Sequence, residues 1–131
     1  MLVTTLGMAR GQGKREQKPP AREPNTAMGK ETFLKYCASC HGEDGKGNGP
    51  PAIALKPPPS DLTTLSARHE GKYPAGYVSA LVKFGRSLTA HGSTDMPVWG
   101  ARFKELDPGR DPTGQQHVDD VVAYIRSLQV K

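Results

Sequence analysis

Three stretches of the chain repeat apolar residues with the period of an α-helix, and polar or Gly/Pro-rich stretches separate them. The first helix is expected to begin at Asn25 or Thr26, both good N-cap residues, and to run into Cys37. Within it, Gly29, Phe33 and Cys37 are four residues apart, so they lie on one face of the helix.

A second helix is predicted over residues 74–84, because Pro74 suits its first position and Gly85 the position after its end. Its apolar stripe consists of Tyr77, Val78, Leu81 and Val82. A short helical turn is expected at residues 100–105.

The last helix has the clearest pattern. Thr113 and Gln116 have the spacing of a capping box. The apolar residues after them recur with a period of 3.6: Val118, Val121, Val122 and Ile125. No stretch has a strong strand pattern, so the predicted fold class is all-α, with three to four helices joined by long loops.

Two stretches have no apolar period. Residues 1–25 mix charges with glycine and proline and predict a flexible tail, which leaves residues 26–131 as a single domain. Residues 42–59 are rich in glycine and proline and predict an irregular loop. That loop is long for a compact domain, and wrapping around a cofactor would account for its length.

Composition supports a cofactor at the core. Of the 131 residues only 35% are hydrophobic, while 15 are glycine and 12 proline. A small domain with so few apolar residues needs an additional source of stability, such as a large apolar group at its centre.

The formal charge of +5 is concentrated at one end. Residues 1–30 hold six basic and two acidic side chains, so the remaining 101 residues carry a net charge of only +1. We therefore expect no nucleic-acid binding, which needs a basic face on the folded part. No stretch reaches the roughly 20 apolar residues of a membrane span, and no signal peptide is recognisable, although the tail could serve as a tether.

The only two cysteines, Cys37 and Cys40, are three residues apart, and His41 follows directly. Such a pair is found in disulfides, redox dithiols, zinc sites and haem attachment motifs. A disulfide across so short a loop would constrain little chain entropy. Zinc would need a second ligand pair, and a redox dithiol would need a βαβ context, neither of which is seen. The adjacent histidine selects haem attachment, in which each thiol adds to one vinyl group of the porphyrin and His41 binds the iron.

The iron of an electron carrier takes a methionine or a second histidine as its sixth ligand. Met96 is the candidate, because it lies in a loop where Pro97 keeps it extended. Met1 and Met8 lie in the tail, and Met28 lies on the same helix as Cys37. The rival ligands are three histidines: His91 in the same loop, and the weaker candidates His69 and His117.

At this point the chain resembles the class I cytochrome c family, from about Gly29 to Leu128. The resemblance rests on three segments: Gly29-x-x-x-Phe33-x-x-x-Cys37-x-x-Cys40-His41-Gly42, Met96-Pro97-x-Trp99, and Asp120-Val121-Val122-Ala123-Tyr124-Ile125. It implies a cytochrome c fold around one covalently bound haem c. It also implies that Gly29 lets the two terminal helices cross closely, with Phe33 against residues such as Val121 and Tyr124.

The resemblance assigns two further site residues. Pro50, with Pro51 as the alternative, would accept a hydrogen bond from the ligand histidine through its carbonyl group, which would fix the imidazole tautomer. Trp99 would lie near the haem edge or a propionate, the alternative being an ordinary core tryptophan.

The implied function is one-electron transfer by a His41/Met96-ligated haem, in a soluble or tethered carrier rather than an enzyme. The alternative is a haem enzyme or a gas or peroxide sensor with a labile sixth ligand, served by groups such as His91 or Arg86. The chain could also be a domain or subunit of a larger oxidoreductase. The implied partners are redox proteins, and the implied location is the periplasm or another extracytoplasmic compartment.

Overall fold

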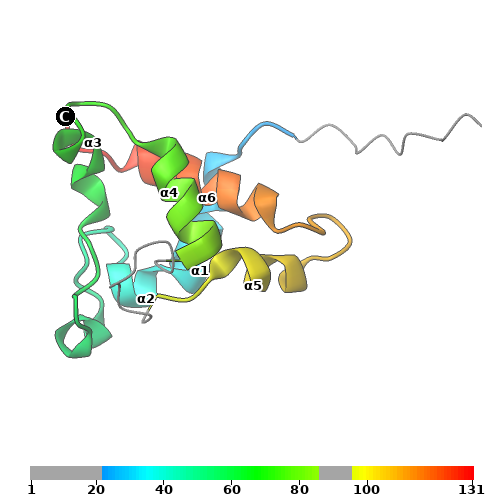
Figure 1. The fold of residues 1–131 in the computed structure, drawn as a ribbon, viewed down its shortest axis with the longest axis horizontal. Coiled ribbons are helices and arrows are strands. Elements are labelled where there is room, and N and C mark those ends of the chain that lie inside the picture. The colour runs from blue at the N-terminus through cyan, green and yellow to red at the C-terminus, as the bar shows by residue number, and fades with distance from the viewer. Residues whose placement is uncertain (1–21, 86–95) are drawn as a thin grey trace, which may run out of the picture.

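The computed structural model describes residues 22–85 and 96–131, and this part of the chain is helical without a β-strand (Figure 1). Its α-helices are α1 (Thr26–Tyr36), α2 (Ala38–His41), α3 (Leu65–Arg68), α4 (Ala75–Phe84), α5 (Trp99–Leu106) and α6 (Gln115–Ser127). Two 3-10 helices, η1 (Pro50–Ala54) and η2 (Leu62–Thr64), lie between α2 and α3. The all-α class is confirmed. The four helices of eight residues or more match the expected number, and the four-residue α2 and α3 are additional.

Helix α1 begins where the sequence predicts. The side chain of Asn25 accepts hydrogen bonds from the backbone N–H groups of Ala27, at 3.0 Å, and Met28, at 3.1 Å. These bonds satisfy two of the donors that a helix N-terminus leaves without intrahelical partners. The helix ends at Cys37, whose N–H still donates to the carbonyl of Phe33. The end of α1 therefore presents the first residue of the Cys-x-x-Cys-His motif.

Helices α1 and α6 cross at Gly29 (Figure 1). A Cβ atom added at Gly29 would lie 1.9 Å from the carbonyl oxygen of Asp120 in α6. Any larger residue would therefore push the helices apart, so the close crossing implied by the resemblance is present and depends on glycine.

The core is centred on this crossing. Phe33 of α1 is completely buried and lies 5.3 Å, ring to ring, from Tyr124 of α6. Val118 and Val121 of α6 are also fully buried, as is Phe103 of α5. Burying one such side chain contributes about 1.5–3 kcal/mol to folding, so this small set accounts for much of the apolar stabilisation.

Helix α4 matches its predicted range within one residue, since Pro74 is its N-cap rather than its first helical residue. The predicted stripe is only partly buried. Val78 and Val82 belong to the core, whereas Tyr77 is 54% exposed. The sequence pattern located the helix correctly, and all four residues of the stripe, Tyr77, Val78, Leu81 and Val82, line one cavity.

The start of α6 corrects the predicted capping box. Gly114 is the N-cap, and Thr113 accepts only a 3.3 Å hydrogen bond from the N–H of Gln115. The carboxylate of Asp111 caps the helix instead: it accepts from the backbone N–H of His117 at 2.9 Å and from the Nδ1 of the same residue at 2.6 Å. A buried carboxylate at a helix N-terminus is favourable because it satisfies free N–H groups and opposes the helix dipole.

The predicted boundary of the tail at residue 25 also needs correction. The guanidinium of Arg22 forms hydrogen bonds of 2.5 and 3.1 Å with the carboxylate of Asp120, which is only 2% exposed. The N–H of Asn25 donates to the same carboxylate at 2.7 Å. Residues 22–25 are therefore attached to α6 because they neutralise a buried charge, while residues 1–21 lie outside the described residues.

We expect deletion of residues 1–25 to lower the free energy of unfolding by about 2–3 kcal/mol, because it removes the Arg22 partner of a buried carboxylate and the Asn25 cap. Deletion of residues 1–21 should have little effect. Arg22→Ala alone should reproduce most of the loss, and Glu23→Ala, at an exposed neighbouring side chain, should not. Urea unfolding measures these differences, and equal stability of the two truncated proteins would contradict the role of Arg22.

A second prediction concerns acid stability. Burial acts to raise the pKa of Asp111, but the hydrogen bonds from His117 outweigh it and hold that pKa below its ordinary value. A carboxyl group with a lowered pKa stabilises the fold above its unfolded-state pKa of about 3.9, and this stability is lost as the pH falls through the folded-state pKa.

Asp111→Asn should therefore lower the free energy of unfolding at pH 7 by about 1–2 kcal/mol and flatten its decline below pH 4. Unfolding curves between pH 2.5 and 7 measure both effects. Glu31→Gln, at an exposed position of α1, is the control. An Asp111→Asn protein with the wild-type acid profile would rule out this carboxylate as a source of acid sensitivity.

Candidate functional site: the cavity around the Cys-x-x-Cys-His motif

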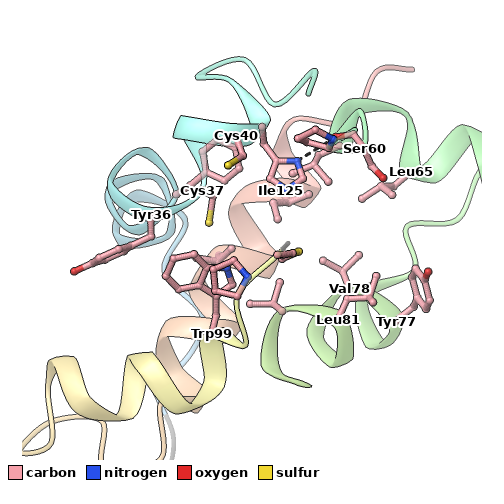
Figure 2. A pocket seen from close by; sticks show the side chains of 18 of the residues that line it. Tyr36, Cys37, Cys40, Ser60, Leu65, Tyr77, Val78, Leu81, Trp99 and Ile125 are labelled. Atoms are coloured by element: carbon pink, nitrogen blue, oxygen red, sulfur yellow. Dashed lines mark hydrogen bonds between the residues drawn. The ribbon is translucent and has the colours of Figure 1, made fainter. Parts of the chain in front are cut away.

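One cavity collects most of the residues singled out in the sequence. Its wall includes Cys37, Cys40, His41, Met96 and Trp99, so five of the six predicted site residues lie together. Figure 2 shows Cys37 and Cys40 on one side and Val78, Leu81 and Tyr77 of α4 on the other. The remaining wall is largely apolar: Phe33, Leu55, Pro57, Pro58, Pro59, Leu62, Leu65, Val82, Pro97, Val121 and Ile125.

The two cysteines are free thiols on the first turn after α1. Cys37 is buried, and Cys40 is partly exposed. Burial, with a smaller effect from Cys40, raises the pKa of Cys37 to about 12, so its thiol is protonated at neutral pH. Catalytic dithiols instead have lowered pKa values, so this environment argues against a thioredoxin-like redox site.

The imidazole of His41 is held by a backbone carbonyl. Its Nδ1 lies 3.1 Å from the carbonyl oxygen of Ser60, which can only accept, so Nδ1 carries the proton (Figure 2). Burial lowers the pKa of His41 and outweighs the opposing effect of the Ser60 hydrogen bond. A neutral ring with its proton on Nδ1 leaves the Nε2 lone pair free, which is the state a metal requires.

This hydrogen bond corrects the prediction for Pro50 and its alternative Pro51. Both lie in η1, and neither lines the cavity. The chain passes through η1 and returns along the Pro57–Pro59 run, which brings the next residue, Ser60, to the imidazole. No sequence signal identifies this acceptor, because the carbonyl group is common to all residues.

Backbone N–H groups of the glycine-rich loop that follows α2 also hold this helix in place. The N–H of Gly47 donates to the carbonyl of His41 at 2.7 Å, and that of Gly49 to the carbonyl of Cys40 at 3.0 Å. A Cβ atom at Gly49 would lie 2.1 Å from the carbonyl oxygen of Ser39, so only glycine permits this approach. The loop predicted as irregular thus holds the motif through backbone hydrogen bonds.

Among the candidate sixth ligands that the structure describes, Met96 and His69 line the cavity. His117 is paired with Asp111 and does not line it. Met28 is also excluded from the wall, and its sulfur accepts from Arg22 at 3.4 Å. His91 and Arg86, together with Met1 and Met8, lie outside the described residues.

Trp99 packs in the aromatic core, and its place near a haem edge or propionate stays a prediction. Its ring lines the cavity and packs against two other aromatic rings, Phe103 at 5.5 Å and Tyr36 at 5.7 Å between centroids. Trp99 is therefore part of the cavity wall and also part of the aromatic core. Tyr36, which also lines the cavity, was missed because a single aromatic beside a motif gives no signal in the sequence.

The donor set and the wall together fit a covalently held haem. The residues that line this mainly apolar cavity include two free thiols, a neutral imidazole with an available Nε2 and a thioether. Iron porphyrins combine a large apolar ring with an iron that accepts nitrogen and sulfur ligands. Among the described residues no group of three or more His, Cys, Asp or Glu side chains could hold a metal ion by itself.

Comparison with known proteins agrees with this chemistry. The family model described as cytochrome c matches residues 26–129, which is most of the chain and includes α1, the motif, Met96 and α6. No curated protein matches the chain. Since the family match spans the whole fold around the cavity, the chain belongs to the cytochrome c family.

Proposed function

We propose that this protein is a one-electron carrier whose covalently bound haem c has His41 and Met96 as its axial ligands. Membership of the family implies the covalent haem c and its iron, and proteins of this family are generally electron carriers. The observation that supports the proposal is that Cys37, Cys40, His41 and Met96 line a single, largely apolar cavity. When bound, the haem supplies an iron that alternates between the ferric and ferrous states.

The residues around the motif would orient this group. Cys37 and Cys40 would hold the ring edge through thioether bonds, and His41 would bind the iron through Nε2. The Ser60 carbonyl keeps the imidazole in the tautomer that leaves Nε2 free, and such a hydrogen bond increases ligand basicity. Because this ring is held by backbone groups, we expect little movement between the two oxidation states.

Met96 and the apolar wall would act on the reduction potential in the same direction. A thioether ligand favours ferrous over ferric iron relative to a second histidine. Burial among Leu, Val, Ile and Pro side chains disfavours the additional charge of the ferric state. If His41 and Met96 both bound the iron, they would leave no free coordination site for a substrate, which would separate a carrier from the alternative of a haem enzyme or gas sensor.

We infer that the partners are other redox proteins and that the site of action is extracytoplasmic, as is typical of cytochrome c domains. Within residues 22–85 and 96–131, no helix is both long and apolar enough to cross a membrane. The proposal includes two arrangements of the carrier: it could be tethered through its N-terminal segment, or it could be a domain or subunit of a larger oxidoreductase.

The covalent attachment predicts a specific mass. Denaturing mass spectrometry of the holoprotein should show the chain heavier by one haem, and acid–acetone should extract none of it. Cys37→Ala and Cys40→Ala should each leave at most one thioether bond and shift the ferrous absorption bands. Haem that is extractable from the wild-type protein would contradict attachment at this motif.

The proposed sixth ligand predicts the effect of Met96→Ala. The substitution should abolish the weak far-red sulfur-to-iron band of the ferric protein and lower the reduction potential, because sulfur ligation stabilises ferrous iron. It should also allow cyanide or imidazole to bind rapidly. Met28→Ala is the matched control and should change none of these properties. If the ferric wild-type protein lacks the far-red band, and His69→Gln or His91→Gln rather than Met96→Ala alters the spectrum, the ligand is a histidine.

A further inference from the structure

The side chain of Gln129, two residues after the end of α6, joins three parts of the chain and has no role in the function proposed so far. Its amide oxygen accepts from the backbone N–H of Ser66 at 2.8 Å. Its amide nitrogen donates to the carbonyls of Leu62, at 2.6 Å, and Ile125, at 3.0 Å. Both N–H groups of the amide and its oxygen are thus engaged, so the side chain is held in one orientation.

One of these partners, Leu62, lies in the segment that orients the imidazole of the motif. The carbonyl of Ser60, two residues earlier, accepts from Nδ1 of His41 at 3.1 Å (Figure 2). Residues 60–66 form only the three-residue η2 and the start of the four-residue α3. Such short helical pieces have little stability of their own. Contacts with the rest of the domain must therefore fix where the Ser60 carbonyl lies.

The glycine-rich loop provides the first set of these contacts. The carbonyl of Gly45 accepts from the N–H of Leu62 at 2.7 Å. A Cβ atom added at Gly47 would lie 2.4 Å from the carbonyl oxygen of Pro59 and 3.2 Å from the carbonyl carbon of Ser60. The loop and the segment therefore pack backbone against backbone next to the acceptor of His41.

The residues that follow α6 provide the second set of contacts. Figure 1 shows the C-terminal end of the chain beside α3. Besides the two hydrogen bonds that Gln129 makes to Leu62 and Ser66, the N–H of Val130 donates to the carbonyl of Thr63 at 2.9 Å. Gln129 is the one residue of this group that binds the segment through its side chain, so its contribution can be tested by substitution.

We propose that Gln129 is a positioning residue for the haem ligand His41. By holding the backbone of Leu62, it keeps the carbonyl of Ser60 within hydrogen-bond distance of the imidazole. This inference rests on the proposed function, because it concerns the histidine that would bind the iron. Gln129 itself does not line the cavity, so it acts on the iron only through this backbone segment.

The expected effect on the reduction potential has a definite sign. A ligand histidine whose Nδ1–H donates to a carbonyl is more basic than one without this hydrogen bond. A more basic ligand favours the ferric state, which carries one more positive charge than the ferrous state. Loss of the hydrogen bond between His41 and Ser60 should therefore raise the reduction potential.

A purely structural role of Gln129 predicts the opposite sign. If the substitution only loosened the cavity wall, water would enter the cavity and stabilise the additional charge of the ferric state. The reduction potential would then fall. The direction of the change thus separates a positioning role from general loosening of the wall.

The first test is spectroelectrochemistry of the holoprotein, after haem content and the far-red sulfur band have been measured on the same samples. Gln129→Leu removes all three hydrogen bonds of the amide and should raise the equilibrium constant for reduction about threefold, which is about 30 mV for a one-electron couple. Gln115→Leu is the matched control, since Gln115 lies in the first turn of α6 and binds Lys83 and Asp119 instead. It should leave the potential unchanged.

The second test is hydrogen exchange measured by NMR on the ferrous holoprotein. In Gln129→Leu, the Nδ1–H of His41 should exchange at least tenfold faster than in the wild type. The backbone N–H groups of Phe33 and Val121, at the crossing of α1 and α6, should keep their wild-type rates. Core amides of this kind exchange through global unfolding, so they report any general loss of stability.

Gln129→Glu separates the donor and acceptor functions of the amide. An ionised carboxylate can accept from Ser66 but cannot donate to the carbonyl of Leu62, so at pH 7 this variant should behave like Gln129→Leu. A protonated carboxyl group can do both. Protection of the His41 Nδ1–H should therefore return toward the wild-type value at the same pH, as the pH falls through the ordinary pKa of glutamate, about 4.3.

Three results would overturn the role of Gln129 and leave the carrier function intact. They are an unchanged exchange rate of the His41 Nδ1–H in Gln129→Leu, an equal acceleration at Phe33 and Val121, and a fall in the equilibrium constant for reduction. Absence of covalent haem from the wild-type protein would instead overturn the proposed function, and this inference with it.

Discussion

The close crossing of α1 and α6 at Gly29 is the constraint on which the rest of the structure depends. A carbonyl oxygen of α6 lies where a Cβ atom of α1 would be, so any residue larger than glycine would push the two helices apart. The crossing buries Phe33 and sets the direction of α1, whose last turn leads into Cys37. Val121 and Ile125, on α6, line the same cavity as Cys37, so the helix crossing and the cavity form one packed unit.

A buried charge reinforces this crossing from the N-terminal side. Asp120 supplies the carbonyl that faces Gly29, and its carboxylate accepts from Arg22, Asn25 and Gln116. One residue of α6 thus determines both how closely α1 approaches and where the chain enters α1. Because removing one partner from a buried carboxylate costs more than the net contribution of the pair, this entry point is sensitive to change.

The Cys-x-x-Cys-His motif is held in place mainly by backbone groups. The carbonyls of His41 and Cys40 accept from the glycine-rich loop, and the carbonyl of Ser60 orients the His41 ring. Backbone hydrogen bonds hold a ligand more rigidly than long side chains, because less conformational entropy is lost in forming them. The side chains are then free to provide an apolar wall, with Arg68 as its single charge among the described residues.

Local patterns in the sequence determined the helices and the cofactor chemistry. The caps and apolar period located α1, α4 and α6 within a few residues, because these signals act over a few neighbouring positions. Cys37, Cys40 and His41 were proposed for haem attachment because that chemistry requires those residue types at that spacing. Met96 followed from the small number of methionines in the chain, and its place in the cavity wall agrees with that choice.

Only the tertiary structure decided which distant groups meet. The sequence could not show that Ser60 rather than Pro50 accepts from His41, since every residue offers the same carbonyl and loop geometry selects one. It could not show that Asp111 rather than Thr113 caps α6, or that Arg22 belongs to the folded domain, because both depend on burial of a carboxylate. Residue type and spacing thus specify the local helices and the motif. Three-dimensional packing determines which backbone and charged groups become buried, and which hydrogen-bond or ion-pair partner each of them meets.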